Sequence, residues 1–270
     1  MRRRKTLNKH DLSSRRRRGK RGKWIFYLTV LAVVCVGIVF LMRLDFWKIK
    51  EIRVEGAERV NRVTVLEIAR KQIDGIYWKI FPKNNFLIYP KEAIEKEILN
   101  IEPAALVVKV NAKLDQTLKI DVKERLTAAL WCKKTEECYF MDEAGIIFTP
   151  AEGESEFVKY YGLIDSNPLG KRFGEPNFLP ELSNFTNKIK ELGLLPVRVD
   201  IIDKDQGRMY FEDESNLLFL PYEKNKKALF ENIELFINDL RAKNGGLLPA
   251  FEYIDARYGN KIFYKILSNE

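Results

Sequence analysis

A basic block followed directly by an uncharged apolar block constrains this chain more than any other feature. Residues 1–23 hold twelve Lys and Arg against one acid, Asp11, and the 19 residues 24–42 contain no charge. A helix of that length is about 28 Å long, close to the hydrocarbon thickness of a bilayer. Its Leu, Ile, Val and Phe residues together favour insertion by about 4–7 kcal/mol. We therefore predict a basic tail at residues 1–23 and a transmembrane helix at 24–42.

The order of the two blocks predicts the orientation of the chain. Positive residues stay on the cytoplasmic side, so we expect a cytoplasmic N-terminus and an extracytoplasmic C-terminal part, the single-pass type II arrangement. A cleaved signal peptide is the alternative, but the apolar run exceeds the usual 7–15 residues and no small-x-small cleavage pattern follows it. We interpret the segment as an uncleaved anchor, with a juxtamembrane linker at residues 43–48.

Most of the positive charge belongs to the tail. The net charge is +9, and the first 23 residues contribute +11, so the other 247 residues carry −2. A nearly neutral exported part argues against nucleic acid as a partner. We expect the tail to set topology and to attract anionic lipid; a tail that also binds nucleic acid or a cytoplasmic protein is the alternative.

Residues 49–125 predict a small α+β domain. Alternating apolar residues in 49–56 indicate a strand, and Asn61 caps a helix expected near 62–73. A second helix is expected after Pro90, behind an irregular stretch. Two strands follow, the second with a strict period of two over residues 118–123. The expected order is strand, helix, helix, strand, strand.

Residues 126–270 predict a second, β-rich domain with flanking helices. A hairpin is expected over residues 139–148, an amphipathic helix opened by Pro176, three strands between 196 and 220, and a helix over 224–243. The chain then shows two strands, 253–258 and 261–266, joined by Gly259-Asn260, a pair suited to a two-residue hairpin turn.

The cysteines leave three alternatives open. Cys35 lies inside the predicted span, whereas Cys132 and Cys138 fall in a strand–turn–strand stretch of the exported part. In an oxidising compartment the latter two can form a disulfide that stabilises the fold by about 2 kcal/mol, which is the interpretation we favour. The other two alternatives are a pair of free thiols and a metal or redox site.

The residues for several kinds of catalysis are missing. His10 is the only histidine and lies in the tail, which excludes histidine-dependent triads and zinc-protease helices from the exported part. Neither a Ser-x-x-Lys motif nor a phosphate-binding glycine loop is present. Scattered carboxylates leave a paired-acid glycosidase open. We expect no catalytic residue, no cofactor and no metal site.

At this point the chain resembles the FtsQ/DivIB family of bacterial cell-division proteins, over nearly its whole length. IKEIRVEG (49–56), NFL (85–87) and LKIDVKER (118–125) resemble the POTRA domain of that family. VKERLTAALW (122–131) is similar to its junction motif, with Thr127 in place of the expected Pro. Tyr139, Asp142, Gly145 and Phe148 resemble its next hairpin, and YIDARY (253–258) its C-terminal signature. The cysteine pair does not belong to this pattern.

The resemblance implies a non-enzymatic divisome scaffold in the cell membrane at the division septum. Its partners would be small membrane proteins of the FtsB/DivIC and FtsL types, and it would link them to septal wall synthesis. Capture would occur by strand addition at the last hairpin, where Arg257 and Tyr258 match the Arg-Tyr pair of the family. The expected partner-binding residues are Arg257, Tyr258, Lys261, Ile262, Phe263, Tyr264 and Lys265.

Three alternatives remain at this point. In the first, Tyr258 and Ile262 are ordinary core residues and a loop covers the sheet edge. The second is a POTRA-bearing transport or assembly component, which would need a downstream barrel region. The third is a membrane-tethered cell-wall enzyme, which would need a pocket with paired carboxylates.

Overall fold

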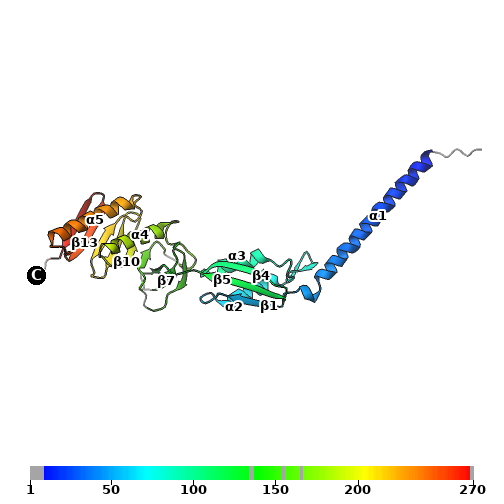
Figure 1. Ribbon diagram of the computed structural model, residues 1–270, viewed down its shortest axis with the longest axis horizontal. Coiled ribbons are helices and arrows are strands. Elements are labelled where there is room, and N and C mark those ends of the chain that lie inside the picture. The colour runs from blue at the N-terminus through cyan, green and yellow to red at the C-terminus, as the bar shows by residue number, and fades with distance from the viewer. Residues whose placement is uncertain (1–8, 134–136, 154–155, 165–166, 268–270) are drawn as a thin grey trace, which may run out of the picture. The chain divides into compact units, whose positions relative to one another are not determined.

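The computed structural model describes residues 9–133, 137–153, 156–164 and 167–267, with the side chains of residues 9–22 left aside. Within these residues the fold is α+β, with five α-helices and mixed sheets, as the sequence predicts (Figure 1). The first helix, α1 (Lys9–Met42), contains the segment Lys23–Met42, which is long and apolar enough to span a membrane. Its side chains in that segment are not buried by the rest of the protein.

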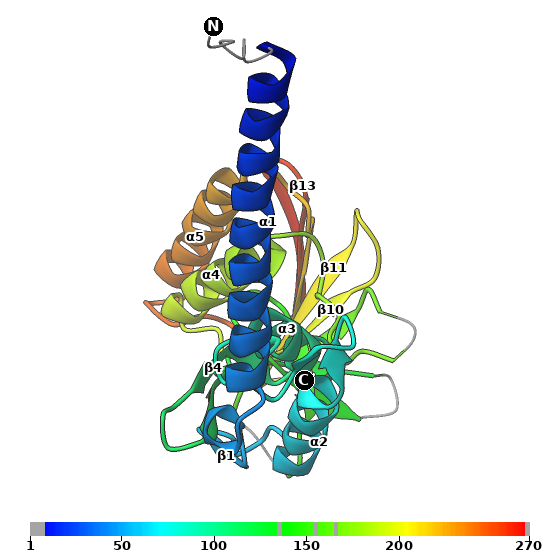
Figure 2. The same cartoon turned by 90° about the vertical axis from the view of Figure 1, so that its right-hand side faces the viewer.

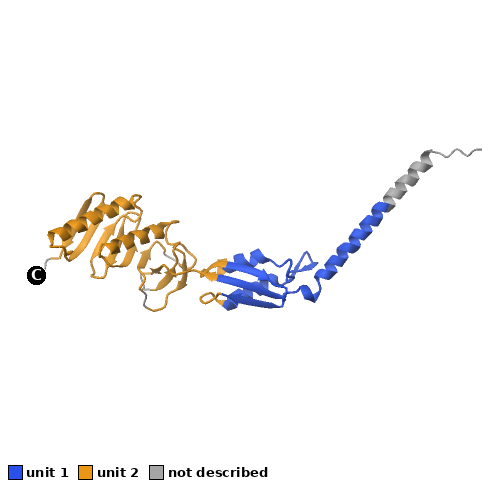
Figure 3. Ribbon diagram, in the orientation of Figure 1, with its two compact units in different colours: residues 1–55, 62–98, 108–122 blue, residues 56–61, 99–107, 123–270 orange. Residues whose placement is uncertain are grey.

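The chain divides into two compact units (Figure 3). Unit 1 comprises Met1–Glu55, Arg62–Ile98 and Val108–Val122, and unit 2 comprises Gly56–Asn61, Leu99–Val107 and Lys123–Glu270.

Unit 1 contains most of a sheet in the order β1-β5-β4, built from β1 (Glu51–Glu55), β5 (Thr117–Glu124) and β4 (Ala105–Ala112), whose β4 start and β5 end are counted with unit 2. Strands β1 and β5 run parallel, from Glu51 opposite Thr117 to Glu55 opposite Asp121. The helices are α2 (Arg62–Ile73) and α3 (Lys91–Ile101). The predicted alternation in β5 buries Leu118, Ile120 and Val122.

Two features of unit 1 were not predicted as the structure has them. The stretch expected to be irregular contains a short hairpin, β2 (Ile76–Tyr77) and β3 (Phe81–Pro82). The stretch expected to be a linker contains a 3-10 helix, η1 (Asp45–Trp47), whose Trp47 ring stacks on Phe86 at 5.1 Å. Trp47 therefore belongs to the packing of unit 1, because its partly buried ring is stacked on a neighbouring aromatic ring.

Unit 2 is built on a nine-stranded mixed sheet in the order β14-β13-β12-β11-β10-β9-β6-β7-β8. The strands are β6 (Ala129–Cys132), β7 (Cys138–Met141), β8 (Ile147–Pro150), β9 (Lys159–Gly162), β10 (Pro196–Ile201), β11 (Gly207–Phe211), β12 (Asn216–Phe219), β13 (Phe251–Tyr258) and β14 (Lys261–Ile266). Helices α4 (Phe178–Glu191) and α5 (Lys226–Lys243) contact each other and pack on one face of the sheet (Figure 2). Their apolar side chains join those of the strands in a single core.

Both helices start two residues later than predicted. Pro176 does not open α4, because Asn177 adopts a left-handed conformation (φ 70°) and separates the proline from the helix. Helix α5 begins at Lys226 because the Asn225 side chain accepts a hydrogen bond from the Ala228 amide at 3.1 Å, which makes Asn225 the N-cap.

The structure joins Cys132 and Cys138 in a disulfide between directly paired residues of β6 and β7. The two free thiols and the metal or redox site are therefore not what the structure shows. The third cysteine, Cys35, is free and lies on α1.

We expect reduction of this disulfide to destabilise unit 2 without unfolding it. The cross-link closes a loop with a sequence separation of only 6, so its loss costs about 2 kcal/mol in the chain-entropy estimate. That corresponds to a fall of about 4–8 °C in the melting temperature of a domain of this size. Thermal unfolding of the Cys35→Ser chain with and without reductant measures the effect. An unchanged melting temperature would show that the cross-link contributes nothing.

Candidate partner-binding edge

The hairpin predicted to bind partners ends the nine-stranded sheet. Strand β14 pairs with β13 on one side only, and β13 pairs in turn with β12. An edge strand leaves part of its backbone N–H and C=O groups unpaired, which makes it a template for an incoming strand. Phe251 opposite Ile266 and Tyr258 opposite Lys261 set the register of the hairpin. The turn between its strands is held to α5, because Asn232 Nδ2 donates to the Gly259 carbonyl at 3.2 Å.

The opposite edge of the same sheet is covered by the chain itself. On β8, the Ile147 amide donates to the Lys171 carbonyl at 2.9 Å, and the Ile147 carbonyl accepts from the Gly170 amide at 2.8 Å. Ile146 bridges to Arg172 as well. Pro150, at the end of β8, has no N–H to offer an added strand.

The edges of the unit 1 sheet are protected differently. On β4, the Val110 amide donates to Glu95 Oε1 at 2.8 Å, and the Tyr89 hydroxyl lies 3.2 Å from both the Val110 carbonyl and the Ala112 amide. Strand β1 carries charge, with Arg53 bonded to Glu51 at 2.7 Å. Such capping and charge discourage strand addition. Among the described residues, β14 is thus the edge that combines an open backbone with exposed aromatic side chains.

The side chains of β14 divide between the two faces of the sheet. Tyr264 contacts Phe236 of α5 with ring centroids 4.9 Å apart, and Ile262 packs against the core. Phe263 lies on the helix-free face, where its ring meets Tyr258 edge-on at 5.3 Å. Phe263 is 52% exposed, Tyr264 45% and Tyr258 57%. Each of these rings therefore contacts another aromatic ring and still offers apolar area to a partner.

Charged residues surround these rings. Lys261 is exposed beside the turn, and Lys265 forms an ion pair with Glu252 of β13 at 2.5 Å. Arg257 is bonded twice to Asp255, through Nε at 2.8 Å and Nη2 at 2.7 Å, and its guanidinium lies 5.8 Å from the Tyr258 ring. An acidic residue of a partner would thus meet an arginine that already has a carboxylate neighbour.

The Arg257–Asp255 pair changes how Asp255 titrates. The hydrogen bonds from the Arg257 side chain lower the pKa of the Asp255 carboxyl, although burial acts in the opposite direction. A carboxyl whose pKa is lower in the folded than in the unfolded chain stabilises the fold above its unfolded pKa of about 3.9. That contribution is lost as the pH falls through the folded pKa.

We therefore expect Arg257→Gln to raise the pKa of Asp255 and to weaken the fold at neutral pH. Removing a hydrogen-bonded partner of a buried carboxylate costs about 1–3 kcal/mol. The stability that the original chain gains from the lowered pKa of Asp255 disappears on acidification. The difference in unfolding free energy between the two chains should therefore shrink from pH 7 to pH 3. Urea unfolding at both pH values measures it, and a difference that stays constant or grows would contradict the assignment.

The predicted site residues come together on one hairpin, and the alternative of a covered edge fits only one of them. Ile262 is packed against the core, as that alternative supposed, whereas Tyr258 is exposed. The sequence analysis did not include two further residues of this hairpin among the site residues. Ile266 adds a 41% exposed apolar side chain to the strand, and Asp255 holds Arg257. The Asp-x-Arg spacing, which places both side chains on one face of a strand, was the available signal.

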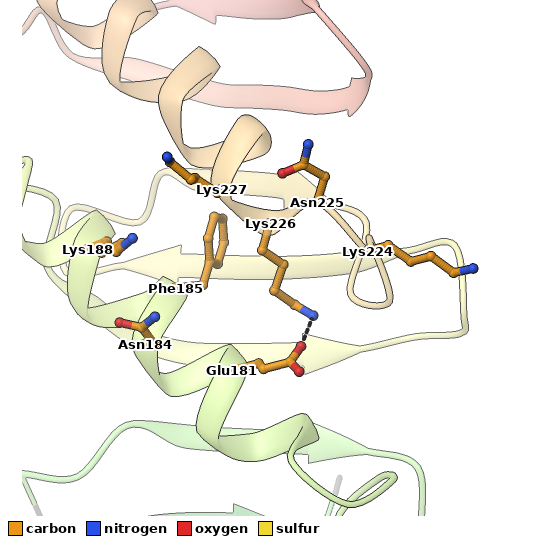
Figure 4. Close-up of a pocket in the computed structure, with 8 residues that line it drawn as sticks. All are labelled: Glu181, Asn184, Phe185, Lys188, Lys224, Asn225, Lys226 and Lys227. Atoms are coloured by element: carbon orange, nitrogen blue, oxygen red, sulfur yellow. Dashed lines mark hydrogen bonds and ion pairs between the residues drawn. The ribbon is translucent and has the colours of Figure 1, made fainter.

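A shallow hollow of about 260 Å³ lies elsewhere in unit 2, between α4 and the start of α5 (Figure 4). Its lining contains one carboxylate, Glu181, which forms an ion pair with Lys226 at 2.7 Å. Figure 4 shows the side chains of Lys224 and Lys227 pointing away from that pair. This hollow therefore lacks the two opposed carboxylates of a glycosidase. No group of three or more His, Cys, Asp or Glu that could hold a metal ion occurs among the described residues.

Comparison with known proteins does not extend this picture, since neither a family model nor a curated protein matches the chain.

Proposed function

We propose that this chain is a non-enzymatic scaffold of the bacterial divisome, of the FtsQ/DivIB type. The observation that carries the proposal is the uncovered edge strand β14 with its exposed Phe263 and Tyr264. Strand addition at this edge would supply main-chain hydrogen bonds, and the aromatic rings would supply side-chain contacts that select the partner. The expected partners are FtsB/DivIC-like and FtsL-like membrane proteins, which the scaffold would link to septal wall synthesis.

The rest of the chain has a consistent role in this proposal. Residues 24–42 would anchor the protein in the cell membrane, with the basic tail in the cytoplasm. Residues 49–125 would form a POTRA domain; the order β1, α2, α3, β4, β5 supports this, and the hairpin β2–β3 is an addition within it. Residues 126–270 would then present β14 on the extracytoplasmic side of the division septum.

Co-expression with an FtsB-type partner tests the proposal. The full chain, purified in detergent, should retain the partner, and binding should slow hydrogen exchange at the backbone amides of β14 and leave those of β8 unchanged. Strand β8 is the matched control because it is the other end of the same sheet. Retention without slowed exchange in β14 would argue for a scaffold that uses another surface, and lack of retention would argue against the proposal.

A further inference from the structure

Unit 1 carries an exposed apolar patch beside the C-terminal end of α1. Its members come from the segment between α1 and η1, from η1, from the β2–β3 hairpin and from the loop after it: Leu44, Phe46, Ile76, Trp78, Ile80 and Leu87. We call these six residues the hairpin patch. Trp78, in the turn of the hairpin, is 82% exposed, an unusual environment for the largest apolar side chain.

Several bonds fix the hairpin patch to the end of the predicted span. Arg43, the first residue after the uncharged run, donates from Nε to the Ile80 carbonyl at 3.1 Å. The Asn85 side chain, fully buried, donates to the Met42 carbonyl at 2.8 Å. The Phe86 amide donates to the Trp47 carbonyl at 2.9 Å. The Ile80 carbonyl, two residues after Trp78, therefore lies within one arginine side chain of the residue where the hydrocarbon region is expected to end.

The backbone of the turn is shaped to present this tryptophan. Trp78 and Lys79 both adopt left-handed conformations, with φ of 47° and 63°. Such conformations are unfavourable for residues with a Cβ and are found mainly at glycine. The geometry itself is that of a tight hairpin turn, closed by the bond from the Ile80 amide to the Tyr77 carbonyl at 2.9 Å. The use of an exposed tryptophan there is what packing within unit 1 does not explain, because Trp78 is 82% exposed.

The charges around the hairpin patch fit a lipid surface. Arg43, Lys50 and Lys79 are exposed, Lys83 lies 5.5 Å from the Tyr77 ring, and Lys48 is paired with Asp45. Acids are present as well: Asp74 is exposed, and Asp115 precedes Gln116, whose side chain donates to the Asp45 and Phe46 carbonyls. Tryptophan is enriched at the level of lipid headgroups, and basic residues at a membrane surface attract anionic headgroups.

We infer that the β2–β3 hairpin inserts Trp78, Ile76 and Ile80 into the outer headgroup region of the membrane that α1 spans. The hairpin is then a second membrane contact, which fixes the orientation of unit 1 at the bilayer. This inference rests on the proposed anchoring by α1, but it does not require any division partner.

Tryptophan fluorescence of the full chain in lipid nanodiscs, one chain per disc, tests the inference. The discs contain phosphatidylcholine and phosphatidylglycerol with brominated acyl chains, which quench tryptophan in or near the hydrocarbon. The difference in emission between the original chain and Trp78→Phe gives the contribution of Trp78. The difference between the original chain and Trp24→Phe gives the contribution of Trp24, which lies at the other end of the span. We expect brominated lipid to quench both contributions, and aqueous iodide to leave that of Trp78 unchanged.

The control moves the tryptophan within unit 1. Trp78→Phe combined with Val63→Trp places it at the start of α2, an exposed position beyond the end of β1 that is farther from α1. Its emission should be quenched by iodide and not by brominated lipid. Quenching of Trp24 by brominated lipid together with quenching of Trp78 by iodide alone would contradict insertion of the hairpin. Anchoring by α1 would be supported in that case. If brominated lipid quenches neither, α1 is not in the bilayer, and the anchoring fails together with the inference.

Discussion

Phe263→Asp should abolish capture of an FtsB-type partner while leaving unit 2 folded. Phe263 lies on the edge strand, is 52% exposed, and touches Tyr258 on the helix-free face of the sheet. A carboxylate there removes the apolar contact and must lose water when an added strand covers it. Aromatic residues at the centre of an interface often contribute 2 kcal/mol or more, so binding should weaken at least about 30-fold.

The control for this prediction is Leu235→Asp. Leu235 lies on α5 in the same unit, is 69% exposed, and therefore offers the same kind of change away from the edge. Substitutions at exposed positions usually change stability by less than about 0.5 kcal/mol, so both variants should melt close to the original chain. Retained partner is measured by pull-down from detergent and by titration. Equal loss in both variants would point to a general effect of added charge, and unchanged binding by Phe263→Asp would remove β14 from the site.

The identity of the last hairpin could be predicted from the sequence, but its position at the edge of the sheet could not. The Gly259-Asn260 turn and the flanking apolar residues identify the two strands, because these are local signals. Which strand lies outermost depends on the order of all nine strands, including three parallel pairings between segments far apart in the chain. Local periodicity carries no information on such pairings.

Two other elements of the structure, β9 and the β2–β3 hairpin, were not predicted from the sequence. Strand β9 was missed because it is four residues long and its neighbours, β6 and β10, lie on either side of it only in the folded sheet. The β2–β3 hairpin was missed because Trp78 and Lys79 occupy turn conformations that sequence rules reserve for glycine and asparagine. In the first case tertiary pairing decides the structure, and in the second a turn overrides the local preference of its residues.

The second large effect is expected for Gly162→Ala, a substitution in β9 that should lower the stability of unit 2. Strand β9 lies between β6 and β10 and so connects the two parts of the sheet. Gly162 has φ of 96°, and a Cβ added there would lie 2.1 Å from the Ile201 carbonyl oxygen of β10. The obstacle is backbone, which cannot move away by changing a rotamer. The Gly162 carbonyl also accepts the indole N–H of buried Trp131 at 3.0 Å, so a shift of β9 disturbs the core as well.

We expect Gly162→Ala to destabilise unit 2 by about 2–5 kcal/mol, the sum of a left-handed alanine and an overpacked contact. The matched control is Gly246→Ala, since Gly246 has φ of 93° in the same unit but nothing within 4 Å of an added Cβ. This control should lose only the conformational part, about 1–2 kcal/mol. Urea unfolding of the full chain in detergent measures both variants, with Trp24, Trp47 and Trp78 replaced by Phe in every chain so that the emission reports Trp131 alone. Equal losses would show that β9 can move away from β10 at no cost, and the tight parallel pairing at Gly162 would then not hold the sheet together.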